Sequence, residues 1–185
     1  AVSGLPKWPG QRRFLLRGFI DHRYQQLQTN GKGKLVWIGR MEEEKNPQRW
    51  IDVFRESQFS QGLMIGEGSL MTRLNTTGIQ MTRRFLSTPT EIMNLISADD
   101  TLLLSSRSEG LPLVVLEALQ MGLRVVMPPV GAWQELQRLV KSDRLLIGED
   151  LTALVRYPSI ATTAPNLRLF SQRRFRRNVY RFFLH

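Results

Sequence analysis

The sequence predicts an α/β fold in which a Rossmann-like parallel sheet carries helices on both faces. Short apolar runs alternate along the chain with segments whose apolar residues recur at helical spacing. The runs are apolar almost throughout, as is typical of parallel strands that helices cover on both faces. A chain of 185 residues is long enough to bury one good core or two small ones.

Six short segments have the pattern of buried strands, and glycine ends several of them. The predicted strands are residues 35–39, 62–66, 79–83, 101–106, 124–128 and 144–148. The segment 79–83 has the weakest pattern of the six. Six strands in such an alternation fit one Rossmann-like half.

The segments between these strands are expected to be helices. Residues 46–58 carry apolar side chains at helical spacing, with a proline that is acceptable in the first turn. Thr88 is a suitable N-cap for a helix over 88–98, and Gly122 is a suitable end for a helix over 112–122. Two further helices are expected, one that begins at residue 67 and one over 131–140.

The chain divides into three parts. Glycine and proline are frequent in residues 1–33, which we expect to be a linker or a remnant segment. Residues 34–166 hold the alternating strand and helix pattern. Residues 167–185 combine arginine with Leu, Phe, Val and Tyr, and are predicted to form a basic amphipathic helix that packs or lies on lipid.

The overall charge of +10 is concentrated at the two ends of the chain. Residues 1–34 carry +6 and residues 151–185 carry +7, so residues 35–150 carry −3. A domain whose main face grips nucleic acid is not expected to have an acidic centre. Basic ends instead suggest contact with something anionic, such as a membrane surface, an acidic polymer or another part of the same protein.

Composition also bounds the location of the chain. There is no cysteine, which excludes a disulfide framework and a thiolate zinc site. No apolar run approaches the roughly 18 residues that would span a bilayer, and the first residues lack the apolar region of a signal peptide. We therefore expect a cytoplasmic location, with peripheral contact at the inner face of the membrane through the basic ends.

Ligands of parallel α/β sheets bind at the carboxyl ends of the strands, and charged residues follow the first predicted strand. Arg40 and Lys45 come shortly after Gly39. An arginine fork and a lysine point charge at this edge could clamp a pyrophosphate. The alternative is that both are surface charges that pair with the glutamates at 42–44.

A second glycine-rich loop follows the predicted strand 62–66. Gly66 and Gly68 are separated by one residue there. Such a loop could cradle a phosphate, but the alternative is a tight turn between a strand and a helix.

Two glutamates eight positions apart, in the stretch EGLPLVVLEA, point to a further anion site. Pro112 suits a first helical turn, so the backbone N–H groups of Gly110 and Leu111 would point outward from a positive helix end. Glu109 lies at the same mouth. Glu117 lies inside the helix, where a carboxylate on an apolar face needs a partner such as a ribose diol. The alternative is that Glu117 faces solvent and Glu109 is a cap.

The two glutamates, the apolar strand before them and the A-L-x-x-G-x-x-V-V pattern after them resemble the donor-binding half of retaining glycosyltransferases with the GT-B fold, family 4. The similarity extends from about Lys34 to Phe183. Arg107 departs from the family pattern, which usually has a small or aromatic residue there. The matching segments are LVWIGRMEEEKNPQRWIDVF, LMIGEGSL, the long block from Glu91 to Leu136, and LFSQRRFRRNVYRFF.

This resemblance implies a role for each candidate residue. Arg40 and Lys45 would hold the diphosphate of a nucleotide-sugar, Glu109 would be the catalytic residue and touch hydroxyls of the transferred sugar, and Glu117 would bind the ribose. No metal or other cofactor is expected, because the cations and the helix terminus neutralise the leaving diphosphate. The implied donor-binding residues are Gly39, Arg40, Lys45, Gly66, Gly68, Glu109, Gly110, Leu111, Pro112, Leu113 and Glu117.

The resemblance further implies that residues 34–166 are the nucleotide-sugar-binding domain of an enzyme that transfers a sugar to a glycan or lipid-linked acceptor, in bacterial surface polysaccharide or lipopolysaccharide synthesis. The partner would be an N-terminal acceptor-binding domain that this chain lacks, and no specific nucleic acid is expected. The domain alone is expected to be inactive. The alternatives are half of a sugar-nucleotide epimerase and a non-catalytic basic binding module.

Overall fold

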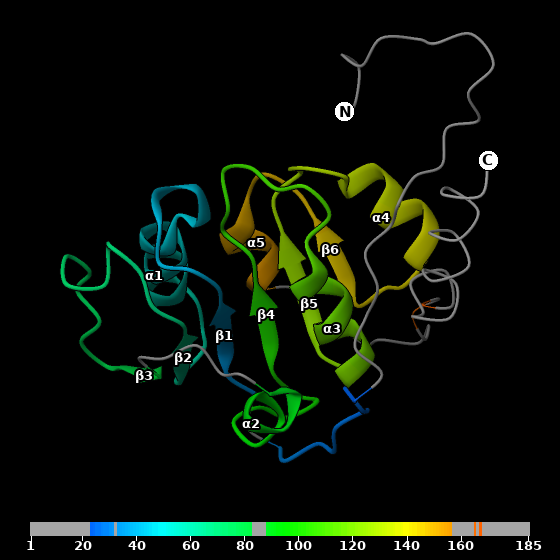
Figure 1. Cartoon of the computed structure of the whole chain (residues 1–185), viewed down its shortest axis with the longest axis horizontal. Helices are drawn as coiled ribbons and strands as arrows, with labels where there is room; N and C mark the ends of the chain where they lie inside the picture. Colours follow the sequence, from blue (N-terminus) through cyan, green and yellow to red (C-terminus); the bar gives the residue numbers. More distant parts are fainter. Residues whose placement is uncertain (1–22, 32, 83–87, 157–164, 166, 168–185) are drawn as a thin grey trace, which may run out of the picture.

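The computed structural model describes residues 23–31, 33–82, 88–156, 165 and 167. Its centre is one six-stranded sheet in the order β3-β2-β1-β4-β5-β6, and every pair of neighbouring strands is parallel (Figure 1). The predicted Rossmann-like sheet is therefore confirmed. The strands are β1 (Leu35–Ile38), β2 (Gly62–Ile65), β3 (Ile79–Thr82), β4 (Thr101–Leu103), β5 (Arg124–Met127) and β6 (Leu145–Ile147).

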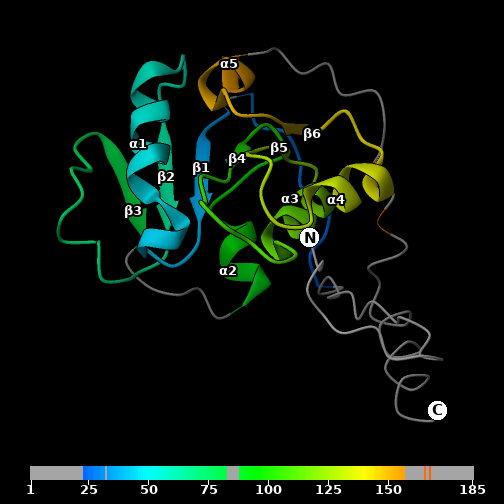
Figure 2. The same ribbon diagram turned by 90° about the horizontal axis from the view of Figure 1, so that it is seen from above.

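Helices cover both faces of this sheet (Figure 2). Successive residues of a strand point to opposite faces, so Val36 joins one core cluster while Leu35 and Trp37 join the other. One cluster includes residues of α2, α3 and α4, and the other includes residues of α1 and α5. The helices are α1 (Pro47–Glu56), α2 (Pro89–Met93), α3 (Leu113–Met121), α4 (Trp133–Val140) and α5 (Leu151–Arg156), with a 3-10 turn η1 (Glu43–Lys45).

Capping residues set the ends of two helices as the sequence indicates. The Thr88 hydroxyl accepts a hydrogen bond from the backbone N–H of Glu91, and the Glu91 carboxylate accepts one from the backbone N–H of Thr88. This reciprocal pair is a capping box at the start of α2. Gly122 ends α3 with a φ of 94°, in the left-handed region that glycine adopts without steric cost.

The expected helix from residue 67 does not form, and the helix expected over 88–98 ends at Met93. In the first segment, the backbone N–H of Ser69 donates to the Glu42 carboxylate and that of Leu70 donates to the Met41 carbonyl. In the second, the backbone N–H of Ser97 donates to the Asp100 carboxylate. Both segments therefore place their backbone donors in long-range or side-chain bonds in place of a helical ladder.

Part of the amino-terminal segment packs against the sheet domain. Tyr24 is buried in the same cluster as α2, α3 and α4, and Leu27 packs against that cluster. The backbone N–H of Leu27 donates to Met121 O at 2.9 Å, and Ala98 N–H donates to Gln28 O at 3.0 Å. These contacts extend the folded unit to residues that precede Lys34. The expected amphipathic helix over 167–185 lies outside the described residues, except for Leu167.

Candidate functional site

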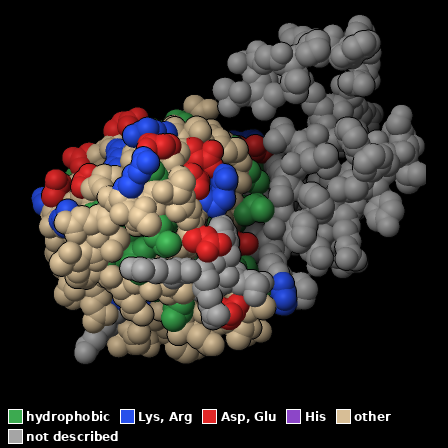
Figure 3. Space-filling model, turned by 60° about the vertical axis from the view of Figure 1, so that its left-hand side comes forward, with side chains coloured by type: hydrophobic (Ala, Val, Ile, Leu, Met, Phe, Trp, Pro, Cys, Tyr) green, Lys and Arg blue, Asp and Glu red, His purple; other side chains and the backbone are tan. Residues whose placement is uncertain are grey.

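The loops that follow β1 and β2 are joined at the carboxyl edge of the sheet. Gly39 N–H donates to Ile65 O at 3.1 Å, and Met41 N–H donates to Glu67 O at 2.8 Å. The loop after β1 is thus anchored to its neighbour before it reaches η1. Along this upper edge of the molecule basic and acidic side chains are interspersed, as Figure 3 shows.

Lys45 and Glu109, which are 64 residues apart in the sequence, meet at this edge. Lys45 Nζ lies 2.8 Å from Glu109 Oε1 and 2.9 Å from Oε2. The Lys45 side chain is 24% exposed and that of Glu109 is 8% exposed. A carboxylate this deeply buried needs hydrogen-bonded partners, and the Lys45 ammonium group supplies two bonds to it. The structure therefore joins the predicted phosphate-binding lysine to the predicted sugar-binding glutamate.

Arg40 has a different environment from Lys45. Its guanidinium group pairs with Glu44 Oε1, and the two side chains are 58% and 46% exposed. Arg107 behaves in the same way: its guanidinium group lies 3.4 Å from the Glu43 carboxylate. Exposed pairs of this kind contribute little to stability. For Arg40 the ligand-free structure thus has the expected alternative, a surface charge paired with a glutamate of the 42–44 segment.

Gly66 and Gly68 allow the two loops to approach closely. Gly66 has a φ of 140°, and a Cβ atom built on it would lie 1.9 Å from Gly39 O. A Cβ atom on Gly68 would lie 2.5 Å from Met41 O. Glycine is therefore required here for loop packing, and a phosphate-binding role for either residue stays a prediction.

Glu42 ties the same two loops together through its side chain. Its carboxylate accepts hydrogen bonds from the Ser69 hydroxyl at 2.6 Å and from the Ser69 backbone N–H at 2.9 Å. These bonds to the charged form hold the pKa of Glu42 below its ordinary value. The tether is therefore present near neutral pH and is lost only as the pH falls through the lowered pKa.

The start of α3 is open where a ligand would meet it. Pro112 is the N-cap residue, Leu113 is 39% exposed, and a Cβ atom on Gly110 would meet nothing within 4 Å. The loop after β5 closes over one side of this start, because the backbone N–H of Ala132 donates to Gly110 O at 2.9 Å. Free space beside the positive end of a nine-residue helix suits an anionic group.

Glu117 lies on α3 between residues of the core. Its neighbours Leu116 and Ala118 are fully buried, and Glu117 itself is half-buried. This position agrees with a carboxylate that is partly accessible from the ligand side of the helix. Its role as the ribose-binding residue stays a prediction.

Sequence analysis missed two buried serines that contact the site. Ser105 and Ser106 follow β4 and are 0% and 1% exposed. Ser106 Oγ donates to Glu109 Oε1 at 2.6 Å, and Ser105 Oγ donates to the Lys45 carbonyl at 3.0 Å. A signal was present, because a pair of serines ends an otherwise apolar predicted strand at the ligand-binding edge.

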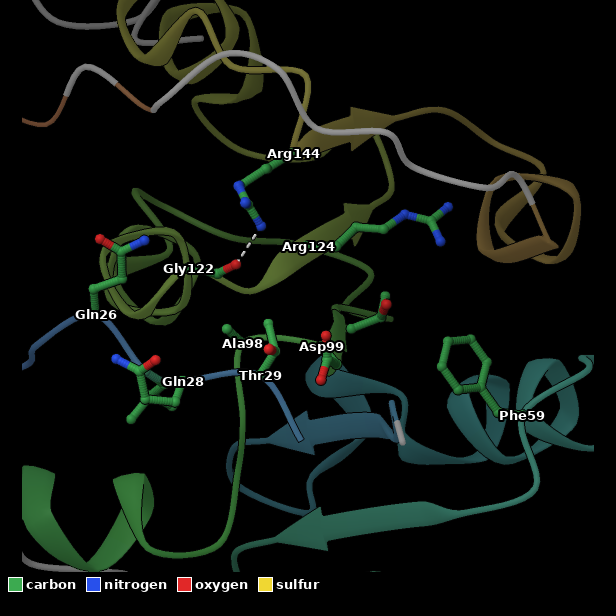
Figure 4. A pocket seen from close by; sticks show the side chains of 11 residues that line it. Gln26, Gln28, Thr29, Phe59, Ala98, Asp99, Gly122, Arg124 and Arg144 are labelled. Carbon is green, nitrogen blue, oxygen red and sulfur yellow. Dashed lines mark hydrogen bonds between the residues drawn. The ribbon is translucent and has the colours of Figure 1, made fainter. Parts of the chain in front are cut away.

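A separate cavity of about 680 Å³ lies at the opposite, amino edge of the sheet (Figure 4). Two of its lining residues are arginines. Arg124, whose pKa is lowered by burial, donates to the carbonyls of Leu154 and Val155 at the end of α5. Arg144 donates to the Gly122 carbonyl at the end of α3. Both guanidinium groups therefore cap helices, and the cavity is distinct from the predicted donor site.

Among the described residues there is no group of three or more His, Asp or Glu side chains placed to hold a metal ion. His22 and His185 lie outside those residues. The expectation that the donor site needs no metal stays a prediction.

The sheet order and the charged groups at its carboxyl edge define a Rossmann-like ligand-binding domain. The chain belongs to the family described as glycosyl transferases group 1, which it matches over residues 32–157. No curated protein matches the sequence closely enough to count as a relative. The expected identification as the C-terminal domain of a GT-B glycosyltransferase is thereby confirmed.

Solved structures of similar fold include the lipopolysaccharide outer core galactosyltransferase WaaB in its apo form, with a TM-score of 0.71, 14% identity, and coverage of 92% of this chain and 55% of that one. Anabaena Alr3699/HepE in complex with UDP has a TM-score of 0.52 and 16% identity, with 67% and 38% coverage. The C-terminal domain of a group 1 family protein (LpcC) from Francisella tularensis has a TM-score of 0.50 and 21% identity, with 74% and 80% coverage. The chain thus spans about half the length of WaaB.

Proposed function

We propose that this chain is the nucleotide-sugar-binding half of a retaining glycosyltransferase. The whole protein would transfer a sugar to a glycan or a lipid-linked acceptor in surface polysaccharide or lipopolysaccharide synthesis. The observation that carries the proposal is the meeting of Lys45 and Glu109 beside the open start of α3. The fold similarity to a lipopolysaccharide galactosyltransferase and to a protein solved with UDP supports this choice.

The donor diphosphate would bind between Lys45 and the start of α3. During transfer the bond from the sugar C1 atom to the phosphate oxygen breaks, the bond from C1 to the acceptor oxygen forms, and negative charge develops on the diphosphate. A lysine ammonium group and a helix N-terminus at that position stabilise this charge. Arg40 is exposed and can leave Glu44 to join them. Because these groups can neutralise the leaving diphosphate, we expect donor binding without a divalent metal.

The sugar would lie against Glu109. A carboxylate accepts hydrogen bonds from sugar hydroxyls, and Glu109 is next to the residues that open onto the start of α3. Glu117, further along the same helix, would accept hydrogen bonds from the ribose hydroxyls. The two glutamates would therefore read two different parts of the same donor.

Calorimetry of the 185-residue chain with UDP, GDP and ADP tests this proposal, with each titration repeated in EDTA. We expect one nucleotide to bind and the chelator to leave its affinity unchanged. If none of the three binds at millimolar concentration, the donor-site assignment is wrong. An epimerase half would share nucleotide binding, but the whole enzyme would then convert a free nucleotide-sugar without any acceptor.

The location of the protein belongs to the same proposal. No helix among the described residues is long and apolar enough to cross a membrane. We propose a cytoplasmic protein that contacts the membrane surface through its basic ends, which lie mostly outside the described residues. Cosedimentation with vesicles that contain anionic lipid tests this contact, and neutral vesicles are the control.

A further inference from the structure

Ser106 is a buried polar residue that the sequence prediction left out of the site. Its side chain lies at the carboxyl end of the central strand β4 and is almost fully buried. The hydroxyl donates to Glu109 Oε1 at 2.6 Å, a short bond of the kind that forms between a hydroxyl and a charged acceptor. Ser106 therefore acts on the orientation of the Glu109 carboxylate.

Glu109 has two supports in the ligand-free structure, and they differ in mobility. Lys45 Nζ bonds both carboxylate oxygens, while Ser106 bonds Oε1 only. Lysine carries its charge on a flexible four-carbon stem, and the Lys45 side chain is partly exposed. The Ser106 hydroxyl is on a short side chain, directly attached to the backbone that leaves the sheet. Only the second support is fixed in place.

Donor binding changes the balance between these supports, if the proposed function is correct. The same Lys45 ammonium group that neutralises Glu109 must also reach the diphosphate. As it turns toward the phosphate oxygens, the Glu109 carboxylate, 8% exposed, keeps fewer partners. We propose that Ser106 is the positioning residue that holds Glu109 directed at the donor sugar while Lys45 serves the diphosphate.

Ser105 supports the opposite partner of the ion pair. Its hydroxyl donates to the backbone carbonyl of Lys45 at 3.0 Å and so fixes the root of the lysine side chain. The two consecutive serines after β4 thus hold the lysine backbone and the glutamate carboxylate in register. This division predicts that loss of the Ser106 hydroxyl alters sugar recognition and leaves diphosphate binding largely intact.

The test compares affinities of the 185-residue chain for a nucleoside diphosphate and for its hexose conjugates, for example UDP against UDP-glucose and UDP-galactose. In Ser106→Ala we expect the affinity for the preferred UDP-hexose to fall about tenfold or more, since a hydrogen bond to a charged group is lost. The affinity for UDP should change by less than about threefold. Ser106→Thr keeps the hydroxyl and should restore most of the loss.

Ser97→Ala is the matched control. Ser97 is also buried, and its hydroxyl donates to a buried carboxylate, that of Asp100, at 3.2 Å near the amino edge of the sheet. This variant loses the same kind of bond far from the donor site, so it should alter stability without separating the two affinities. A double-mutant cycle completes the design: Ser106→Ala should have no further effect on UDP-hexose binding in a Glu109→Ala background.

The outcomes separate the two proposals. If the chain binds no nucleotide, the proposed function fails and this inference fails with it. If nucleotides bind but Ser106→Ala leaves both affinities unchanged, or lowers both equally, Ser106 does not position Glu109 and only this inference fails. Additive losses in the double-mutant cycle would also overturn it.

Discussion

Lys45 and Glu109 neutralise each other in the absence of ligand, and this pairing shapes what each side chain can do. The glutamate is nearly buried, so removing only the lysine leaves a carboxylate with fewer partners at a costly position. Removing only the glutamate leaves a lysine that is partly exposed and can turn to another anion. The two single substitutions are therefore expected to have opposite consequences for binding of a diphosphate.

Lys45→Met should weaken nucleoside diphosphate binding by about 1.5–3 kcal/mol, the range for a hydrogen bond to a charged group. It should also lower the free energy of unfolding, because Glu109 loses its ammonium partner. Calorimetry and urea denaturation measure the two effects. Lys141→Asn is a matched control, because it removes a charge at the end of α4 and keeps a residue type that tolerates the φ of 48° found there. Unchanged nucleotide affinity in Lys45→Met would contradict the assignment.

The two glutamates are expected to respond differently to substitution. Glu117→Ala should weaken nucleoside diphosphate binding by about 1–3 kcal/mol, because the ribose loses its carboxylate partner. Glu109→Ala should leave that affinity unchanged or raise it, since the carboxylate that competes for Lys45 is gone, and yet it should lower turnover of the whole enzyme. Titrations of both variants with the same nucleotide decide the matter. An equal loss of affinity in both would show that the division between ribose and sugar is wrong.

At the scale of the elements, the site depends on how the loops after β1 and β2 are packed. The first loop is joined to the second by backbone bonds, and Glu42 adds a side-chain tether to Ser69. Gly66 and Gly68 make this packing possible because a larger residue at either position would meet the backbone of the other loop. The loops are therefore a single structural unit, and η1 with Lys45 is carried on it.

Gly66→Ala tests this unit. At this position a Cβ atom would lie 1.9 Å from Gly39 O, so the loops must separate, and we expect the free energy of unfolding to fall by about 2–4 kcal/mol. Gly78→Ala is the control, because Gly78 also has a positive φ, 79°, but nothing lies within 4 Å of its Cβ position. That variant should lose only about 1–2 kcal/mol from the backbone strain. Equal losses in urea denaturation would show that the loop contact contributes nothing.

At the scale of the whole molecule, the chain is one half of a larger architecture. It covers 55% of the WaaB chain while 92% of its own length is matched. In a GT-B enzyme the second wall of the cleft, and the surface that holds the acceptor, come from the other domain. Closure of such a cleft orients the reactants and excludes water.

We therefore expect the 185-residue chain to bind the donor without transferring its sugar. Incubation with the preferred nucleotide-sugar and candidate acceptors, followed by product analysis, measures this. The full-length protein is the positive control. Clear transfer by the chain alone would contradict the view that the acceptor surface lies in a second domain.

The sequence by itself determined the elements and most of the candidate site. Continuous apolar runs predicted the strands because parallel strands buried on both faces need them, and Thr88 and Gly122 predicted helix ends because their capping chemistry is local. Lys45 and Glu109 could be selected because each follows a predicted strand at the ligand-binding edge. All of these signals depend on residues within a few positions of one another.

Only the tertiary structure decided which of these residues meet. The bond from Ser106 to Glu109 requires the particular path of the chain after β4, and the ion pair with Lys45 joins loops 64 residues apart. The expected helix at residue 67 failed for the same reason, since the donors of that segment bond to the neighbouring loop. Contacts between loops follow from strand order and loop geometry, which no local pattern of residues records.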